Sequence, residues 1–129
     1  MSRKRDEGRP IWFVNRAVLV VRPRPPFVDW ICSFEDEAPV DRTDAEESVN
    51  SFLIPEFDDP EDTLTWVQEN IETVFEIMLN DWVVDPAFWP EKRDWEAFEE
   101  WFDLEYVDIA WDLVDEPLSS EPPPEGAEA

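Results

Sequence analysis

The strongest structural signal in the sequence is the start of a helix near its centre. Asp59 can accept hydrogen bonds from the free N–H groups of a first helical turn, and Pro60 suits that turn because its φ is fixed. Apolar residues then recur every three or four positions, at Leu64, Val67, Ile71, Val74 and Met78. Because this spacing puts them on one face, it predicts one helix over residues 60–80.

Three segments have the pattern of strands. Residues 17–21 are apolar and mostly β-branched, which predicts a buried, central strand. Residues 51–54 predict a second strand, which Pro55 closes or marks as a sheet edge. From 106 to 113, larger apolar residues alternate with polar or small ones, which predicts a third strand with one face toward water.

Two further helices and a loop complete the pattern. Pro26 can open a short helix, and Asp94 can cap another. Their expected inward residues are Phe27, Trp30, Ile31 and Phe34 in the first helix, and Trp95, Phe98, Trp101 and Phe102 in the second. Residues 35–48 are rich in acids and predict a flexible loop.

The predicted order is β-α-β-α-α-β without an internal repeat. The fold class is therefore α+β: a small two-layer domain, with a three-stranded sheet and helices mainly on one face. We expect this domain to span residues 15–115. A basic, mobile segment at 1–14 precedes it, and a disordered tail rich in proline and glutamate follows at 116–129.

The charge balance is strongly acidic, with 34 acids, 10 bases and a net charge of −24. Residues 1–24 hold seven of the bases and two of the acids. Such a surface repels phosphates and anionic lipid headgroups and attracts cationic partners, although solubility alone also explains it. We expect no direct binding of nucleic acid and no membrane association. No apolar run near the start is long enough to span a bilayer.

The residues that usually carry catalysis are scarce. The chain has no histidine, a single cysteine at Cys32, and glycine only at positions 8 and 126. It therefore lacks histidine-based nucleophile activation, histidine ligands, a cysteine zinc cluster and a phosphate-binding glycine loop in its core. We expect no catalytic residues, no metal and no cofactor. A lone cysteine also suits a reducing compartment, and we expect cytoplasmic residence.

Carboxylates are the remaining chemistry. Asp108 and Asp112 would share one face of the predicted third strand, and a further acidic cluster spans residues 58–62. A solvated sheet face explains the first and helix capping explains the second. The alternative is a hydrolytic enzyme based on carboxylates, with or without a divalent metal, which needs acids that converge across a cleft.

The segment 82–93 combines aromatic rings with two of the few bases. Aromatic and arginine side chains are common anchors of protein interfaces, which makes this segment a candidate contact patch. Its residues are Trp82, Phe88, Trp89 and Arg93. The competing interpretation is that the rings fold back over the helix ends and that Arg93 pairs with an acid.

Several segments together resemble a family of small acidic bacterial proteins of unassigned function, over residues 15–114. The matching residues are Val20, Val21, Arg22, Pro23, Pro26, Phe27 and Trp30, the run 53–58, and Trp89, Pro90, Arg93, Phe98, Trp101, Phe102, Asp103, Asp112 and Leu113. The resemblance implies one small domain of bacterial type. It implies no activity, cofactor or partner, and it transfers no functional residue.

The leading hypothesis is an acidic protein-interaction module that engages a basic protein. Inhibition of a basic toxin and mimicry of nucleic acid both fit such a surface. The carboxylate enzyme remains the alternative, and a homo-oligomeric structural protein is a third hypothesis. The sequence leaves the oligomeric state open.

Overall fold

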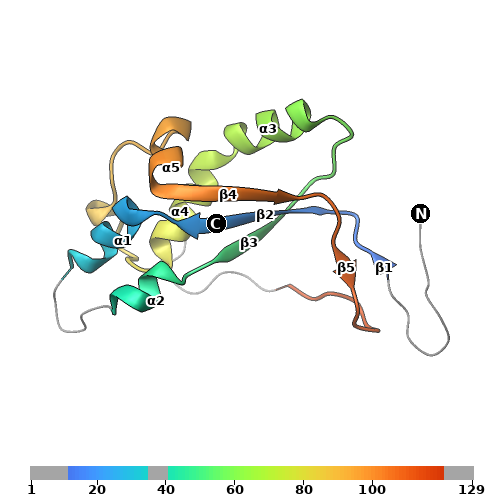
Figure 1. Cartoon of the computed structure of the whole chain (residues 1–129), viewed down its shortest axis with the longest axis horizontal. Helices are drawn as coiled ribbons and strands as arrows, with labels where there is room; N and C mark the ends of the chain where they lie inside the picture. The colour runs from blue at the N-terminus through green and yellow to red at the C-terminus, as the bar shows by residue number, and fades with distance from the viewer. Residues whose placement is uncertain (1–11, 35–40, 121–129) are drawn as a thin grey trace.

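The computed structural model describes residues 12–34 and 41–120. Within these residues, five strands form two sheets (Figure 1). The strands are β1 (Trp12–Phe13), β2 (Ala17–Pro23), β3 (Asn50–Ile54), β4 (Phe102–Val107) and β5 (Trp111–Asp112). The larger sheet has the order β3-β2-β4, and β1 pairs with β5 in a separate two-stranded sheet. All of these pairings are antiparallel.

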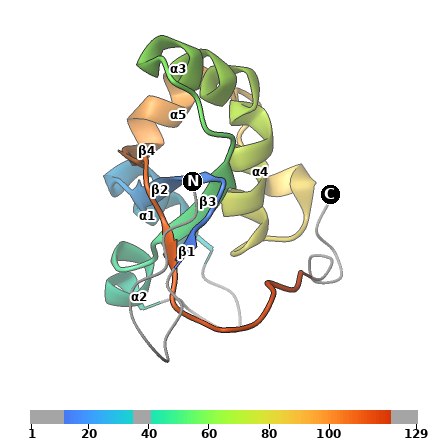
Figure 2. The ribbon, with the colours of Figure 1, turned by 90° about the vertical axis from the view of Figure 1, so that its right-hand side faces the viewer.

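In the described part of the chain, five α-helices and one 3₁₀ helix accompany the sheets. They are α1 (Pro25–Cys32), α2 (Arg42–Glu46), α3 (Pro60–Glu69), α4 (Ile71–Asn80), η1 (Pro86–Phe88) and α5 (Trp95–Trp101). In Figure 1, α1 and α2 lie at the end of the sheet where β2 finishes, and β1 and β5 lie at the opposite end. Figure 2, which looks along the strands, shows α4 beside one face of the sheet. The α+β class predicted from the sequence is confirmed.

The core forms on one face of the sheet. Along β2, Ala17, Leu19 and Val21 are buried, whereas Val18 and Val20 on the other face are half-buried. The helices supply the opposing side chains, mainly aromatic rings: Phe27, Phe75 and Phe98, packed with Phe102 of β4. The ring pairs are tilted or edge-to-face with centroids 4.6–5.5 Å apart, a geometry that adds to the free energy of ring burial. The prediction of a central strand with helices mainly on one face is thus confirmed.

The predicted loop at 35–48 is wrong over Arg42–Glu46, which form α2. Asp41 caps this helix, because its carboxylate accepts a hydrogen bond of 2.9 Å from the N–H of Thr43. The side chain of Ala45 is fully buried, so one face of α2 packs on the core. The acid-rich composition indicated a loop, although one of these acids, Asp41, caps a helix and Ala45 is buried in the core. Residues 35–40 lie outside the described part of the chain.

The predicted helix 60–80 is two helices, with a break at Asn70 between α3 and α4. The backbone of Asn70 leaves the helical region at φ −111° and ψ 12°. Its side-chain Nδ2 donates a hydrogen bond of 2.8 Å to the carbonyl O of Trp66. Asparagine amides can compete in this way with the helical hydrogen-bond pattern, which allows the helix to end.

The predicted strand at 106–113 is displaced. β4 begins at Phe102, directly after α5, and ends at Val107, and β5 covers only Trp111–Asp112 in the second sheet. The apolar residues of the predicted alternation are not inward-facing, since Ile109 and Leu113 are about half exposed. The described elements therefore depart from the predicted β-α-β-α-α-β order in four ways: the extra helix α2, the division of the predicted helix 60–80 into α3 and α4, the 3₁₀ helix η1, and the short strands β1 and β5.

The ends of the predicted domain fall as follows. Of the predicted N-terminal segment 1–14, residues 12–13 form β1, and the N–H of Val14 donates a hydrogen bond of 3.0 Å to the carbonyl O of Ala110. Residues 1–11 lie outside the described part of the chain. At the other end, residues 116–120 form no helix or strand, and the rest of the predicted tail is also outside the described part.

Candidate protein interface

The segment 82–93 folds back onto the helices through Trp89. This ring is only 8% exposed, and its Nε1 donates a hydrogen bond of 2.7 Å to the carbonyl O of Val83. The guanidinium carbon of Arg93 lies 5.8 Å from the centroid of the Trp89 ring, within range of a cation–π interaction. The structure thus brings two of the four candidate contact residues together as part of the packing.

The other two candidates are placed differently. Phe88 is 57% exposed, and its ring meets that of Phe34 edge-to-face at 5.9 Å. Its carbonyl O accepts a hydrogen bond of 3.3 Å from Nε1 of Trp30. Trp82 is half-buried, and its own Nε1 is buried without a hydrogen-bond partner in the described residues. The exposed part of the predicted contact patch is therefore centred on Phe88.

A concave site that the sequence did not reveal lies between α3 and β4. It has a volume of about 270 Å³. Its lining comes from α3 (Pro60, Thr63, Leu64, Val67), from the sheet (Leu19, Leu104, Tyr106) and from Trp95 of α5. We call it the α3–β4 pocket. All of these residues except Thr63 and Tyr106 have wholly apolar or indole side chains, so the walls are predominantly apolar.

The walls of the α3–β4 pocket are held by the core on one side and open to solvent on the other. Leu19 and Val67 belong to the buried core, whereas Leu64 is 48% and Tyr106 is 40% exposed. Trp95 is fixed by near-parallel stacking on Phe98, with ring centroids 6.4 Å apart and planes 13° apart. Leu64 and Tyr106 therefore present part of the pocket wall to solvent.

Carboxylates flank the α3 wall of this pocket. Asp59 precedes the lining residue Pro60, and its Oδ1 accepts a hydrogen bond of 2.9 Å from the N–H of Glu61. Glu61 and Asp62 follow in the first turn of α3, and both are exposed. Glu61 lies one helical turn before Leu64, on the same side of the helix. The apolar pocket thus lies beside a negatively charged helix start.

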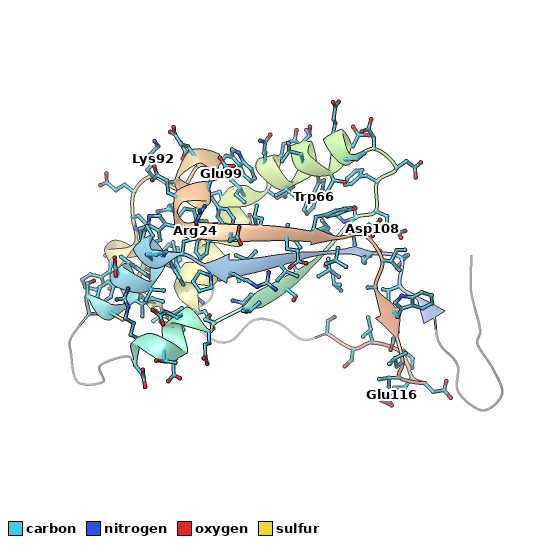
Figure 3. The ribbon with its side chains drawn as sticks, viewed as in Figure 1. Arg24, Trp66, Lys92, Glu99, Asp108 and Glu116 are labelled. Atoms are coloured by element: carbon cyan, nitrogen blue, oxygen red, sulfur yellow. The ribbon has the colours of Figure 1, made fainter. Side chains whose placement is uncertain are left out.

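The two acids singled out in the sequence do not share a strand face. Asp108 follows the end of β4 (Figure 3). Asp112 lies in β5, and its Oδ1 accepts a hydrogen bond of 2.9 Å from the N–H of Val114. Over residues 12–34 and 41–120, no three or more His, Cys, Asp or Glu side chains are grouped so as to hold a metal ion. In the 58–62 cluster, Asp59 caps α3 as predicted.

The few cations are engaged by neighbouring oxygens. The Arg42 guanidinium donates a hydrogen bond of 2.9 Å to Oδ1 of Asp29, and this bond, together with the nearby Glu46, raises the pKa of Arg42. The hydrogen bond to Glu96, with nearby Asp94, raises the pKa of Lys92.

The remaining described cations follow the same rule. Arg22 pairs with Glu105 at 2.8 Å. Arg24 donates a hydrogen bond of 2.8 Å to the carbonyl O of Glu99, which joins the start of α1 to α5 (Figure 3). Arg16 donates to the carbonyl O of Asn15. The described cations therefore leave most of the carboxylate surface without a counter-charge.

Comparison of the chain with protein-family models, with curated proteins and with solved structures found no match. The fold and the site therefore define the class of protein: a small α+β domain with an acidic surface and an apolar pocket between α3 and β4. Within the described ranges, no helix has both the length and the apolar character needed to cross a membrane.

Proposed function

We propose that this chain is a protein-interaction module that binds a basic protein through its carboxylate surface. The observation that carries the proposal is the imbalance of charge on the folded domain. The described residues hold 26 Asp and Glu against six Lys and Arg, and four of these six cations already form ion pairs with carboxylates. Uncompensated charge of one sign repels within the domain and accelerates encounter with a partner of opposite sign.

Two kinds of basic partner fit this proposal. One is a basic toxin, which the domain would inhibit, and the other is a nucleic-acid-binding protein, whose groove the domain would occupy. Competition separates them, because an oligonucleotide displaces the domain only from a nucleic-acid-binding groove. The half-buried, unpaired thiol of Cys32 fits a reducing compartment, and we propose the cytoplasm as the location. The resemblance to small acidic bacterial proteins accords with a bacterial origin.

The test is affinity capture from cell extract at low ionic strength, followed by elution with rising salt. An unrelated protein of equal size and net charge is the matched control bait. We expect a basic protein that this domain retains, that the control does not, and that salt releases, since screening weakens exposed charge pairs. Capture of the same proteins by both baits, or of no basic protein by this domain, would contradict the proposal.

A further inference from the structure

We propose that the α3–β4 pocket receives one apolar side chain of the basic partner, while cations that flank this side chain contact the carboxylates at the start of α3. This inference rests on the proposed function and specifies where and how the partner binds. Interfaces depend on a few anchor side chains that fill desolvated pockets, with polar groups around them.

The size of the pocket favours a side chain over a larger ligand. Its volume of about 270 Å³ lies at or below the lower end of small-molecule sites, which span roughly 300–1,000 Å³. The half-exposed Leu64 and Tyr106 would lose their contact with water when the pocket is filled. A single leucine-sized or phenylalanine-sized anchor matches these dimensions.

The carboxylates around the pocket favour a partner segment in which the anchor side chain is flanked by cations. Asp59, Glu61 and Asp62 adjoin the α3 wall, and none of them pairs with a cation of the described residues. Trp95, which also lines the pocket, lies in the sequence between Asp94 and Glu96, and these two carboxylates share the single cation Lys92. An anchor flanked by lysine or arginine is therefore attracted, and one flanked by acids is repelled.

The experiment uses the full chain and two synthetic heptapeptides of equal charge, KGKFKGK and KGKAKGK. At low salt we expect the phenylalanine peptide to bind about tenfold more tightly than the alanine peptide, as measured by calorimetry, because only its ring fills the pocket. In ¹H–¹⁵N spectra, only the phenylalanine peptide should shift the amide signals of Leu64, Val67 and Leu104.

A matched pair of variants separates the contribution of the pocket to peptide affinity from that of the overall charge. Leu64→Glu and Ile77→Glu each place a carboxylate at a half-exposed position, but Ile77 lies on α4 and does not line the pocket. Leu64→Glu should weaken the phenylalanine peptide about tenfold despite the added negative charge, whereas Ile77→Glu should leave its affinity unchanged or slightly increased. Leu64→Gln serves as the second variant if the Glu variant is less well folded.

The outcomes separate the two proposals. Equal, salt-sensitive binding of both peptides would overturn the pocket assignment and leave the proposed function standing. Equal effects of Leu64→Glu and Ile77→Glu would do the same. Binding of neither peptide would also overturn the pocket assignment, and the capture experiment would then decide the proposed function independently.

Discussion

The Nε of Arg93 lies 3.3 Å from Oε2 of Glu76, and this ion pair connects the segment 82–93 to helix α4. Both side chains are only about a quarter to a third exposed. Arg93 also donates a hydrogen bond of 2.6 Å from its terminal nitrogen to the carbonyl O of Pro90, and its guanidinium faces the Trp89 ring. One side chain therefore fixes the segment through charge, hydrogen bonding and ring contact together.

Replacing Arg93 by alanine should lower the free energy of unfolding by about 1–2 kcal/mol. The change removes a partly buried ion pair and packing on Trp89, and it leaves the Pro90 carbonyl without its donor. Urea denaturation followed by circular dichroism measures the change.

The control is the neighbouring cation. Lys92→Ala removes the same charge from an exposed site, where the ion pair to Glu96 contributes little, so it should change the free energy of unfolding much less than Arg93→Ala does. Equal losses in the two variants would mean that the geometry around Arg93 contributes nothing beyond its charge.

Replacing Thr63 by valine should stabilise the fold by about 1 kcal/mol. Thr63 is 6% exposed, and its Oγ1 is buried without a hydrogen-bond partner in the described residues. A buried hydroxyl that makes no hydrogen bond loses its hydration without compensation, and valine keeps the branched shape without the polar atom.

The melting temperature measures this effect, and Thr63→Ser is the complementary variant. Serine keeps the hydroxyl and removes the methyl group, so it should lower the melting temperature. A melting temperature that falls with valine would indicate that the Oγ1 makes a favourable contact in solution.

The sequence predicted the elements whose causes are local. Asp59 and Asp94 cap α3 and α5 as expected, because each carboxylate accepts its hydrogen bond from an N–H only two or three residues further along the chain. The apolar run 17–21 predicted a central strand. A strand that has neighbours on both edges and is at least partly covered on both faces needs few polar side chains, and this shows directly in its sequence.

The break at Asn70 could not be predicted from the apolar spacing. The buried side chains Val67, Ile71 and Val74 keep a helical spacing across it, so the pattern indicated a single helix. The end of α5 is equally hard to predict from spacing, because Phe102 lies four residues after Phe98, as on a helix face, and yet begins β4. Local spacing does not distinguish a helix end from a continued face when the same residues stay buried.

The α3–β4 pocket depended on these unpredicted features. Its sheet wall includes Leu104, which lies before the predicted strand 106–113, and Tyr106, which the predicted alternation places among the polar or small residues of that strand. Leu64 was expected on the buried stripe but is half exposed at the opening of the pocket. A concave site requires the relative positions of α3 and β4, and these follow from tertiary packing.

Asp59→Ala should lower the free energy of unfolding by about 1 kcal/mol, because the N–H of Glu61 loses its hydrogen-bond acceptor at the start of α3. Asp58→Ala is the matched control: it removes the same charge one residue earlier, and Asp58 does not cap the helix. We expect this control to be neutral or slightly stabilising, since it relieves repulsion among neighbouring acids. Chemical denaturation of both variants tests the difference, and equal effects would show that Asp59 acts only through its charge.

Sodium chloride should raise the melting temperature of the unmodified protein. The described residues alone carry 26 acids and six bases, so repulsion among carboxylates opposes the compact state. Salt shortens the range of this repulsion to about 10 Å at 0.1 M and less at higher concentration, while the buried aromatic core is little affected by this screening. Scanning calorimetry between low salt and about 0.3 M should show a rise of a few degrees, and potassium chloride should act equally, since screening depends on ionic strength. A flat or falling melting temperature would mean that the carboxylates do not strain the fold, and the charge imbalance would then lose its energetic significance for the folded domain.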